Sequence, residues 1–102
     1  MGRGSLDPAT HEIPTDFDSQ LRQALFNLVA VFVAAGSSKD LIVQCTCYLS
    51  DRRYFAVFNR MYGEFFADCS PLPARTTVVT QLVREGVLVE INGVAAVSPA
   101  GR

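Results

Sequence analysis

The apolar residues of this chain change their spacing several times, and these changes limit its possible folds more than any other feature. Between residues 15 and 36 apolar side chains recur at every third or fourth position, the spacing of an amphipathic α-helix. The stripe is made of Leu21, Leu25, Leu28, Val29, Phe32 and Val33. Thr15 or Asp16 can cap the start of this helix, and Gly36 can end it. Such a stripe must pack on a sheet or on another helix.

A strand and a second helix are predicted next. The run 41–49, LIVQCTCYL, is β-rich and too short for another long helix, so it predicts a buried strand. From residue 51 to about residue 66, aromatic residues and Met61 recur at intervals of three and four, which predicts a helix capped at Ser50 or Asp51. Most of these aromatic side chains are expected in the core rather than around a cofactor.

Two further strands are predicted near the C-terminus. Pro71 and Pro73 indicate a loop, after which residues 74–83 predict one strand and residues 87–97 another. Because only the turn Arg84-Glu85-Gly86 separates them, we expect these strands to pair directly and antiparallel. Residues 1–14 are predicted to form turn and loop, with a turn at residues 7–10.

Length and charge limit the class of protein. A chain of 102 residues is expected to form one domain, residues 1–102, with a modest core. Its hydrophobic content of 49% suggests that part of the surface is buried in an oligomer. A formal net charge of −1 and the lack of a basic cluster argue against nucleic acid as a partner.

The residues that could carry metal or redox chemistry are few. The three cysteines include no CxxC pair, so we expect small buried thiols in a reducing compartment and no metal site. His11 is the only histidine and is expected at the surface. The N-terminal residues contain no long apolar run, which predicts neither a signal peptide nor a membrane span. A cytoplasmic protein with no membrane partner is therefore expected.

Arg75 and Glu90 are charged residues inside otherwise apolar, strand-like sequence. Each must reach water, form an ion pair or line a pocket, because burying a lone charge is costly. In an antiparallel hairpin Arg75 would lie closer to Val94 or Ala95 than to Glu90, which makes a salt bridge within one chain improbable. The two residues are then expected to meet across a subunit boundary or through a ligand, or to be separate structural charges.

Several strings in this chain carry a resemblance to a known family. They are DPATHEIP, FDSQLRQALFNLVAVFVAAGSS, YFAVFNRMYGEFF, PARTTVV and VEINGVAAV, in this order. Together they resemble the YjgF/RidA family of enamine and imine deaminases over residues 2–97. The PAR(T/S) segment, followed about one strand later by VEI, is the most specific part of the resemblance.

The resemblance implies an α/β (α+β) fold of the chorismate-mutase-like type. In such a fold a mostly antiparallel sheet carries two helices on one face, and the chain forms a homotrimer with active sites between subunits. In that family the arginine of PAR(T/S) binds the substrate carboxylate, so the resemblance implies this role for Arg75, and a guanidinium fork suits that task. Glu90 matches the catalytic glutamate that orients or deprotonates the attacking water. Thr77 stands where relatives often carry a cysteine that faces the ligand, so the resemblance implies that Thr77 contacts the substrate.

The implied reaction is hydrolysis of 2-aminoacrylate or 2-aminocrotonate to a 2-keto acid and ammonia, with no metal or cofactor. The alternative is a non-catalytic trimer of the same fold that binds small carboxylates or acts as a regulatory partner. This alternative is motivated by the N-terminus, because Met1 stands where relatives have a serine and the preceding hairpin, which carries a pocket tyrosine, is lacking. Either the native chain starts upstream or it is a shortened member with an exposed sheet edge. The charge balance and the lack of a histidine pair argue against the ribonuclease activity implied by the related label, endoribonuclease L-PSP.

Overall fold

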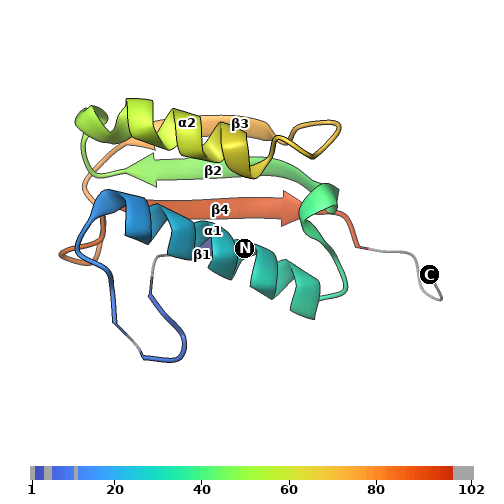
Figure 1. Cartoon of the computed structure of the whole chain (residues 1–102), viewed down its shortest axis with the longest axis horizontal. Helices are drawn as coiled ribbons and strands as arrows, with labels where there is room; N and C mark the ends of the chain where they lie inside the picture. Colours follow the sequence, from blue (N-terminus) through green and yellow to red (C-terminus); the bar gives the residue numbers. More distant parts are fainter. Residues whose placement is uncertain (1, 4–5, 11, 98–102) are drawn as a thin grey trace.

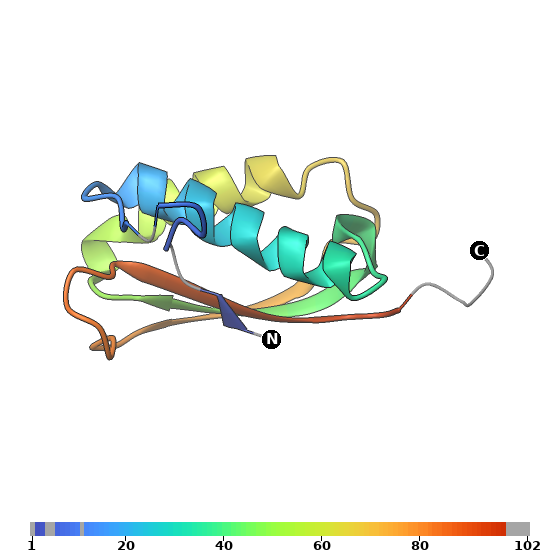
Figure 2. The same cartoon turned by 90° about the horizontal axis from the view of Figure 1, so that it is seen from below.

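The structure, a computed structural model, describes residues 2–3, 6–10 and 12–97. Its elements along the chain are β1 (Gly2–Arg3), α1 (Phe17–Ala34), the 3₁₀ turn η1 (Lys39–Leu41), β2 (Ile42–Leu49), the 3₁₀ turn η2 (Arg52–Tyr54), α2 (Phe55–Phe65), β3 (Ala74–Val79) and β4 (Val89–Ala95). Figure 1 shows the strands side by side as one sheet, and Figure 2 shows both helices on the same face of it. The predicted α+β architecture, with two helices on one face, is confirmed.

Both helices begin and end close to where the sequence predicts. Asp16 caps α1, because its carboxylate accepts a hydrogen bond from the backbone N–H of Ser19 at 3.0 Å. Gly36 follows α1 with a φ of 87°, and the next backbone N–H, from Ser37, donates to the carbonyl of Phe32 at 2.8 Å. The second helical stretch starts as η2, where Asp51 accepts from the backbone N–H of Arg53.

The strand order is β1-β4-β2-β3, so β2 lies between the last two strands. β4 is antiparallel to both β1 and β2, whereas β3 is parallel to β2. Two of the three pairings are thus antiparallel, as the predicted mostly antiparallel sheet requires. The predicted hairpin between the last two strands is wrong.

The hairpin prediction fails because the connection between β3 and β4 is long. β3 stops at Val79 and residues 80–83 are not strand, so residues 80–88 cross the end of β2 instead of turning tightly. Hydrogen bonds hold this connection to the end of β2, from the N–H of Thr80 to the carbonyl of Leu49 and from the N–H of Ser50 to the carbonyl of Leu88. The apolar strand β2 gains a partner on each edge in this arrangement.

The N-terminal residues contain one strand pairing that the sequence did not predict. Gly2 pairs with Asn92 and Arg3 with Ile91, so the prediction of turn and loop throughout residues 1–14 is wrong at β1. Two residues carry no local pattern, and only their pairing with β4 makes them a strand. The turn at residues 7–10 is confirmed, with Asp7 accepting from the N–H of Ala9 at 2.8 Å. His11 lies outside the described residues.

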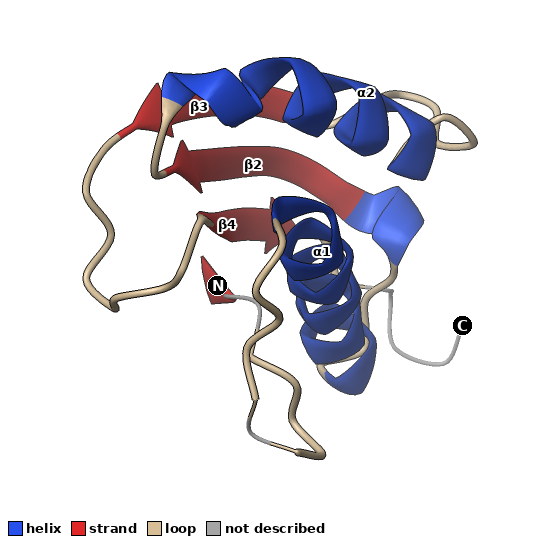
Figure 3. Ribbon diagram, turned by 60° about the vertical axis from the view of Figure 1, so that its left-hand side comes forward, coloured by secondary structure: helices blue, strands red, loops and turns tan. Residues whose placement is uncertain are grey.

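Figure 3 shows the two helices lying over the sheet, and the core side chains pack between these two layers. The largest fully buried side chains of the core are Phe58, Phe66, Leu21, Leu28, Leu49, Ile91, Gln20, Val89, Cys45 and Cys47. Residues that alternate with these along β2 and β4 point to the opposite face, which no described helix covers. The sheet therefore has one face under the helices and one open face. Within the described ranges, no helix combines the length and apolarity needed to cross a membrane.

Candidate functional site

Arg75 lies on β3, at the edge of the sheet, and its side chain reaches under α2. It is paired with Cys45, whose side chain is buried in the core, so both side chains point towards the helices. The guanidinium carbon of Arg75 lies 5.1 Å from the ring centre of Tyr62, 5.3 Å from that of Phe58 and 6.0 Å from that of Phe55. These distances are those of cation–π contacts. The strand and α2 together hold the cation against a row of rings.

No negative group within the described residues neutralises Arg75. The ion pairs found there involve Lys39, Arg53 and Arg60, and no hydrogen bond from Arg75 is present among the described residues. Burial, with a smaller contribution from the neighbouring Cys45 thiol, raises the pKa of Cys47 to about 12, so the Cys47 thiol is neutral and does not balance the charge of Arg75. The N–H donors of Arg75 are therefore available for an anion from outside.

Tyr62 and Thr77 place two buried hydroxyl groups near Arg75. Burial, reinforced by the adjacent Cys45 thiol, raises the pKa of Tyr62, so the phenol stays neutral. Its hydroxyl lies beside that thiol without reaching normal hydrogen-bond geometry. Thr77, opposite Cys47, has a buried hydroxyl oxygen that likewise makes no hydrogen bond within the described part of the chain. Buried hydroxyl groups without a hydrogen bond are uncommon in proteins, and each of these two can still donate or accept one.

Glu90 lies on the other face of the sheet. It pairs with Tyr48 on β2, and both side chains alternate with buried neighbours, so both point to the open face. Asn92 lies on the same face and donates to the Tyr48 hydroxyl at 3.4 Å. The structure therefore does not bring Glu90 together with Arg75 and Thr77. Arg75 and Glu90 form no salt bridge among the described residues, as predicted. The reason differs from the predicted one, because β2 lies between their strands, whereas the prediction assumed a direct hairpin.

The contacts between Arg75 and α2 were not predicted from the sequence. Phe55, Phe58 and Tyr62 are spaced by three and four residues and therefore share one helix face. The sequence placed them in the core, which is confirmed for the buried Phe58 and Tyr62, whereas Phe55 is 43% exposed. The signal available in the sequence was the spacing of these three aromatic residues, which places them on one helix face.

The cysteines are free and buried, as predicted. Cys69 does not lie on β2 with the other two cysteines, and its thiol is 3.3 Å from a carboxylate oxygen of Asp40. Across the described ranges no group of three or more His, Cys, Asp or Glu side chains is arranged to hold a metal ion.

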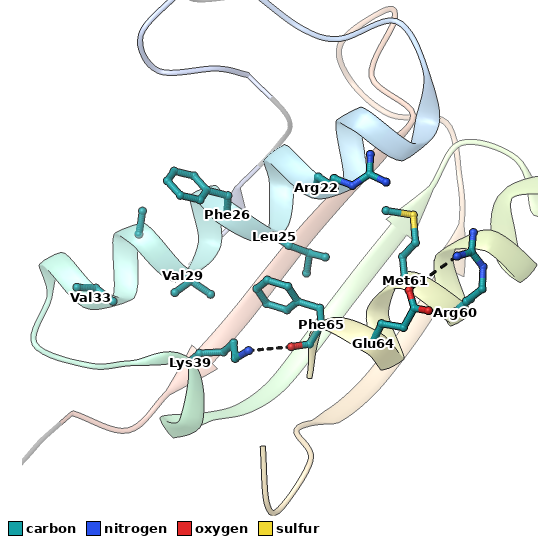
Figure 4. Close-up of a pocket in the computed structure, with 11 residues that line it drawn as sticks. Arg22, Leu25, Phe26, Val29, Val33, Lys39, Arg60, Met61, Glu64 and Phe65 are labelled. Carbon is teal, nitrogen blue, oxygen red and sulfur yellow. Dashed lines mark hydrogen bonds and ion pairs between the residues drawn. The ribbon is translucent and has the colours of Figure 1, made fainter. Parts of the chain in front are cut away.

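A groove of about 820 Å³ runs between α1 and α2 (Figure 4). Its lining residues are Arg22, Leu25, Phe26, Val29, Ala30, Val33, Lys39, Arg60, Met61, Glu64 and Phe65. Lys39 donates to the carbonyl of Phe65 at 2.8 Å and pairs with Asp68, while Arg60 and Glu64 lie 3.8 Å apart. The groove is mostly apolar and contains none of Arg75, Thr77 and Glu90, so it is separate from the predicted site.

Comparison with known proteins assigns this small α+β chain to a family. Residues 1–97 match the family described as Endoribonuclease L-PSP, and the chain belongs to this family, also called YjgF/RidA. It is 38% identical to a RutC family protein of Pyrococcus horikoshii and 35% identical to the 2-iminobutanoate/2-iminopropanoate deaminase of Escherichia coli. Each alignment covers 92% of this chain and 74% of the relative.

A solved structure supports the same assignment. The crystal structure of Escherichia coli TdcF with bound serine superimposes with a TM-score of 0.88 at 34% identity. The match covers 96% of this chain and 78% of TdcF. The family resemblance predicted from the sequence is therefore confirmed.

Proposed function

We propose that this protein is a hydrolytic deaminase of small 2-imino or enamino acids, such as 2-aminoacrylate and 2-aminocrotonate. It would release a 2-keto acid and ammonia without a metal or cofactor. The observation that carries the proposal is Arg75, a cation held on aromatic rings with no anion beside it in the described chain. The names of the relatives in Escherichia coli, both deaminases, support the same reaction class.

In this proposal Arg75 binds the substrate carboxylate through two parallel N–H donors. Thr77, two residues further along β3, offers to the same ligand a hydroxyl that makes no hydrogen bond within the described chain. Glu90 accepts a proton from the water that attacks the imine carbon, and the carbinolamine that forms then loses ammonia. Imine hydrolysis is fast enough unaided that orientation and one base suffice.

Because Arg75 and Glu90 occupy opposite faces of one sheet, the proposed site takes them from different copies of the chain. We propose a homotrimer with one such site at each boundary, formed by single-domain chains in the cytoplasm. The open face, where Val94 is 56% exposed and Val78 38%, offers apolar surface for this packing. No nucleic acid or membrane partner is part of this proposal.

The direct test measures ammonia release from 2-aminoacrylate generated by a pyridoxal-phosphate dehydratase. Arg75→Ala should lower kcat/KM by about 100-fold, the loss expected when a charged hydrogen-bonded pair is removed. Arg22→Ala, on α1 and away from β3, is the matched control and should act like the parent. An Arg75→Ala protein as active as the parent would refute the proposal.

A second test addresses the two-copy site. Arg75→Ala and Glu90→Gln should each be inactive alone. Refolding an equal mixture should restore about a quarter of the parent activity, because random mixing places an intact arginine beside an intact glutamate in about one site of four. No recovery would show that both residues act from one copy. Binding of 2-ketobutyrate by calorimetry without any ammonia release would instead favour the non-catalytic carboxylate-binding trimer.

A further inference from the structure

We propose that Phe55, at the exposed start of α2, is a positioning residue that sets the guanidinium of Arg75 for carboxylate binding. This proposal rests on the proposed function of Arg75 and adds the element that orients it. The three rings that face the Arg75 guanidinium form an aromatic row, made of Phe55, Phe58 and Tyr62. The row lies on one face of α2 above the edge strand β3.

Arg75 needs such support because its surroundings restrain it little. β3 is the last strand of the sheet, so only β2 flanks it among the described residues. A long arginine side chain loses rotamer entropy when it is fixed in one conformation. Without an ion pair or hydrogen bond in the described chain, the rings are the contacts that restrict it.

The geometry of the contact leaves the binding edge of Arg75 free. A ring holds the flat face of a guanidinium, whereas a carboxylate is bound by N–H groups along its edge. Stacking and carboxylate binding therefore use different parts of the same group. The neutral thiol of Cys47, with its pKa raised by burial, and the neutral Tyr62 phenol do not compete with the ligand for the charge.

Phe55 is the member of the row that can be tested without disturbing the core. Phe58 is fully buried and Tyr62 nearly so, whereas 43% of Phe55 is exposed. Its ring centre is also the farthest from Arg75, at 6.0 Å, so a modest effect is expected. Phe55→Leu should raise the KM for 2-aminoacrylate and the Kd for 2-ketobutyrate by about 2- to 5-fold, as for a partly exposed cation–π contact, and leave kcat nearly unchanged.

The controls separate positioning from folding and from direct ligand contact. Phe55→Tyr keeps a ring and should restore parent KM, and Phe26→Leu, an exposed phenylalanine on α1, should change nothing. In the Arg75→Ala background Phe55→Leu should have no further effect on the Kd. An equal loss in that background, or a Phe55→Leu protein with parent KM and Kd, would overturn the proposal.

A measurement without ligand distinguishes failure of this inference from failure of the proposed function. In protein labelled with ¹⁵N-arginine, the side-chain Nε–H of Arg75, assigned with Arg75→Ala, should show an upfield ring-current shift that Phe55→Leu reduces and Phe55→Tyr restores. An unchanged resonance would overturn the positioning role whatever the activity. A parent that shows the shift but neither hydrolyses imines nor binds 2-ketobutyrate would refute the proposed function and leave the aromatic contact upheld.

Discussion

Replacing Gln20 should destabilise this protein more than any other single polar side chain on α1. Gln20 is fully buried, and its amide nitrogen donates to the carbonyls of Pro14 and Gly86, each at 2.8 Å. Its amide oxygen accepts from the backbone N–H of Leu88, also at 2.8 Å. One side chain thus connects α1, the segment before it and the connection that leads into β4.

The size of the effect follows from these three bonds. Gln20→Leu keeps the volume similar but removes both donors and the acceptor, leaving three backbone groups to find other partners. At about 0.5–1.5 kcal/mol net for each bond, the free energy of unfolding should fall by about 2–4 kcal/mol. For a domain of this size that corresponds to a drop in Tm of roughly 10–20 °C.

Urea and thermal unfolding followed by circular dichroism would measure the loss. The matched control is Gln23→Leu, one turn further along α1, where a single bond to Asn27 at 2.9 Å is lost and about 1 kcal/mol is expected. Gln20→Glu tests the hydrogen bonds themselves, because its carboxylate would face two carbonyl oxygens. Protonation restores one donor, so this variant should regain stability as the pH falls from about 7 to about 5. A Gln20→Leu protein that melts like the parent would refute the reasoning.

Two further outcomes follow from burial in the core. Burial raises the pKa of Cys47 to about 12, so at high pH the folded thiol keeps a proton that the unfolded thiol loses. The free energy of unfolding should therefore fall as the pH rises above about 9, by up to about 1.4 kcal/mol per pH unit for this group. Urea unfolding at about pH 8 and pH 10.5 would check this, and Cys47→Ala should show a smaller fall; a larger one would contradict the assignment. Gly93→Ala would place a methyl 3.2 Å from a ring carbon of Phe32 and 3.4 Å from Leu28, and the displaced side chains should cost about 1–2 kcal/mol. An unchanged Tm for Gly93→Ala would show that α1 packs loosely on β4.

The local parts of the fold were predictable because short-range chemistry determines them. The apolar period and the cap at Asp16 define α1, and the run 41–49 defines β2 apart from its first residue. The order of the strands in the sheet depends on pairing between residues far apart in the sequence, which no short sequence pattern predicts. The hairpin rule therefore failed for β3 and β4, and the two-residue strand β1 was missed.

The candidate site was predictable as a set of residues but not as an arrangement. Alternation within one strand places Arg75 and Thr77 on one face, and it does so from the sequence alone. Whether Glu90 shares that face depends on the pairing of β3 and β4 with β2, which is non-local. The contact of Arg75 with Phe55 likewise requires α2 to lie over the edge strand, which follows from the crossover between β2 and β3.

The sheet stands between Arg75 and Glu90, so no side-chain rotation brings both to one small molecule within a single chain. In the proposed trimer, catalysis that uses both groups would be a property of the assembly, and the law of mass action would set what fraction of the chains is active. On dilution of the proposed trimer, turnover per chain should therefore decline. A cell that makes little of this protein would then have less activity than the number of chains indicates, and synthesis level itself would act as a control on the reaction.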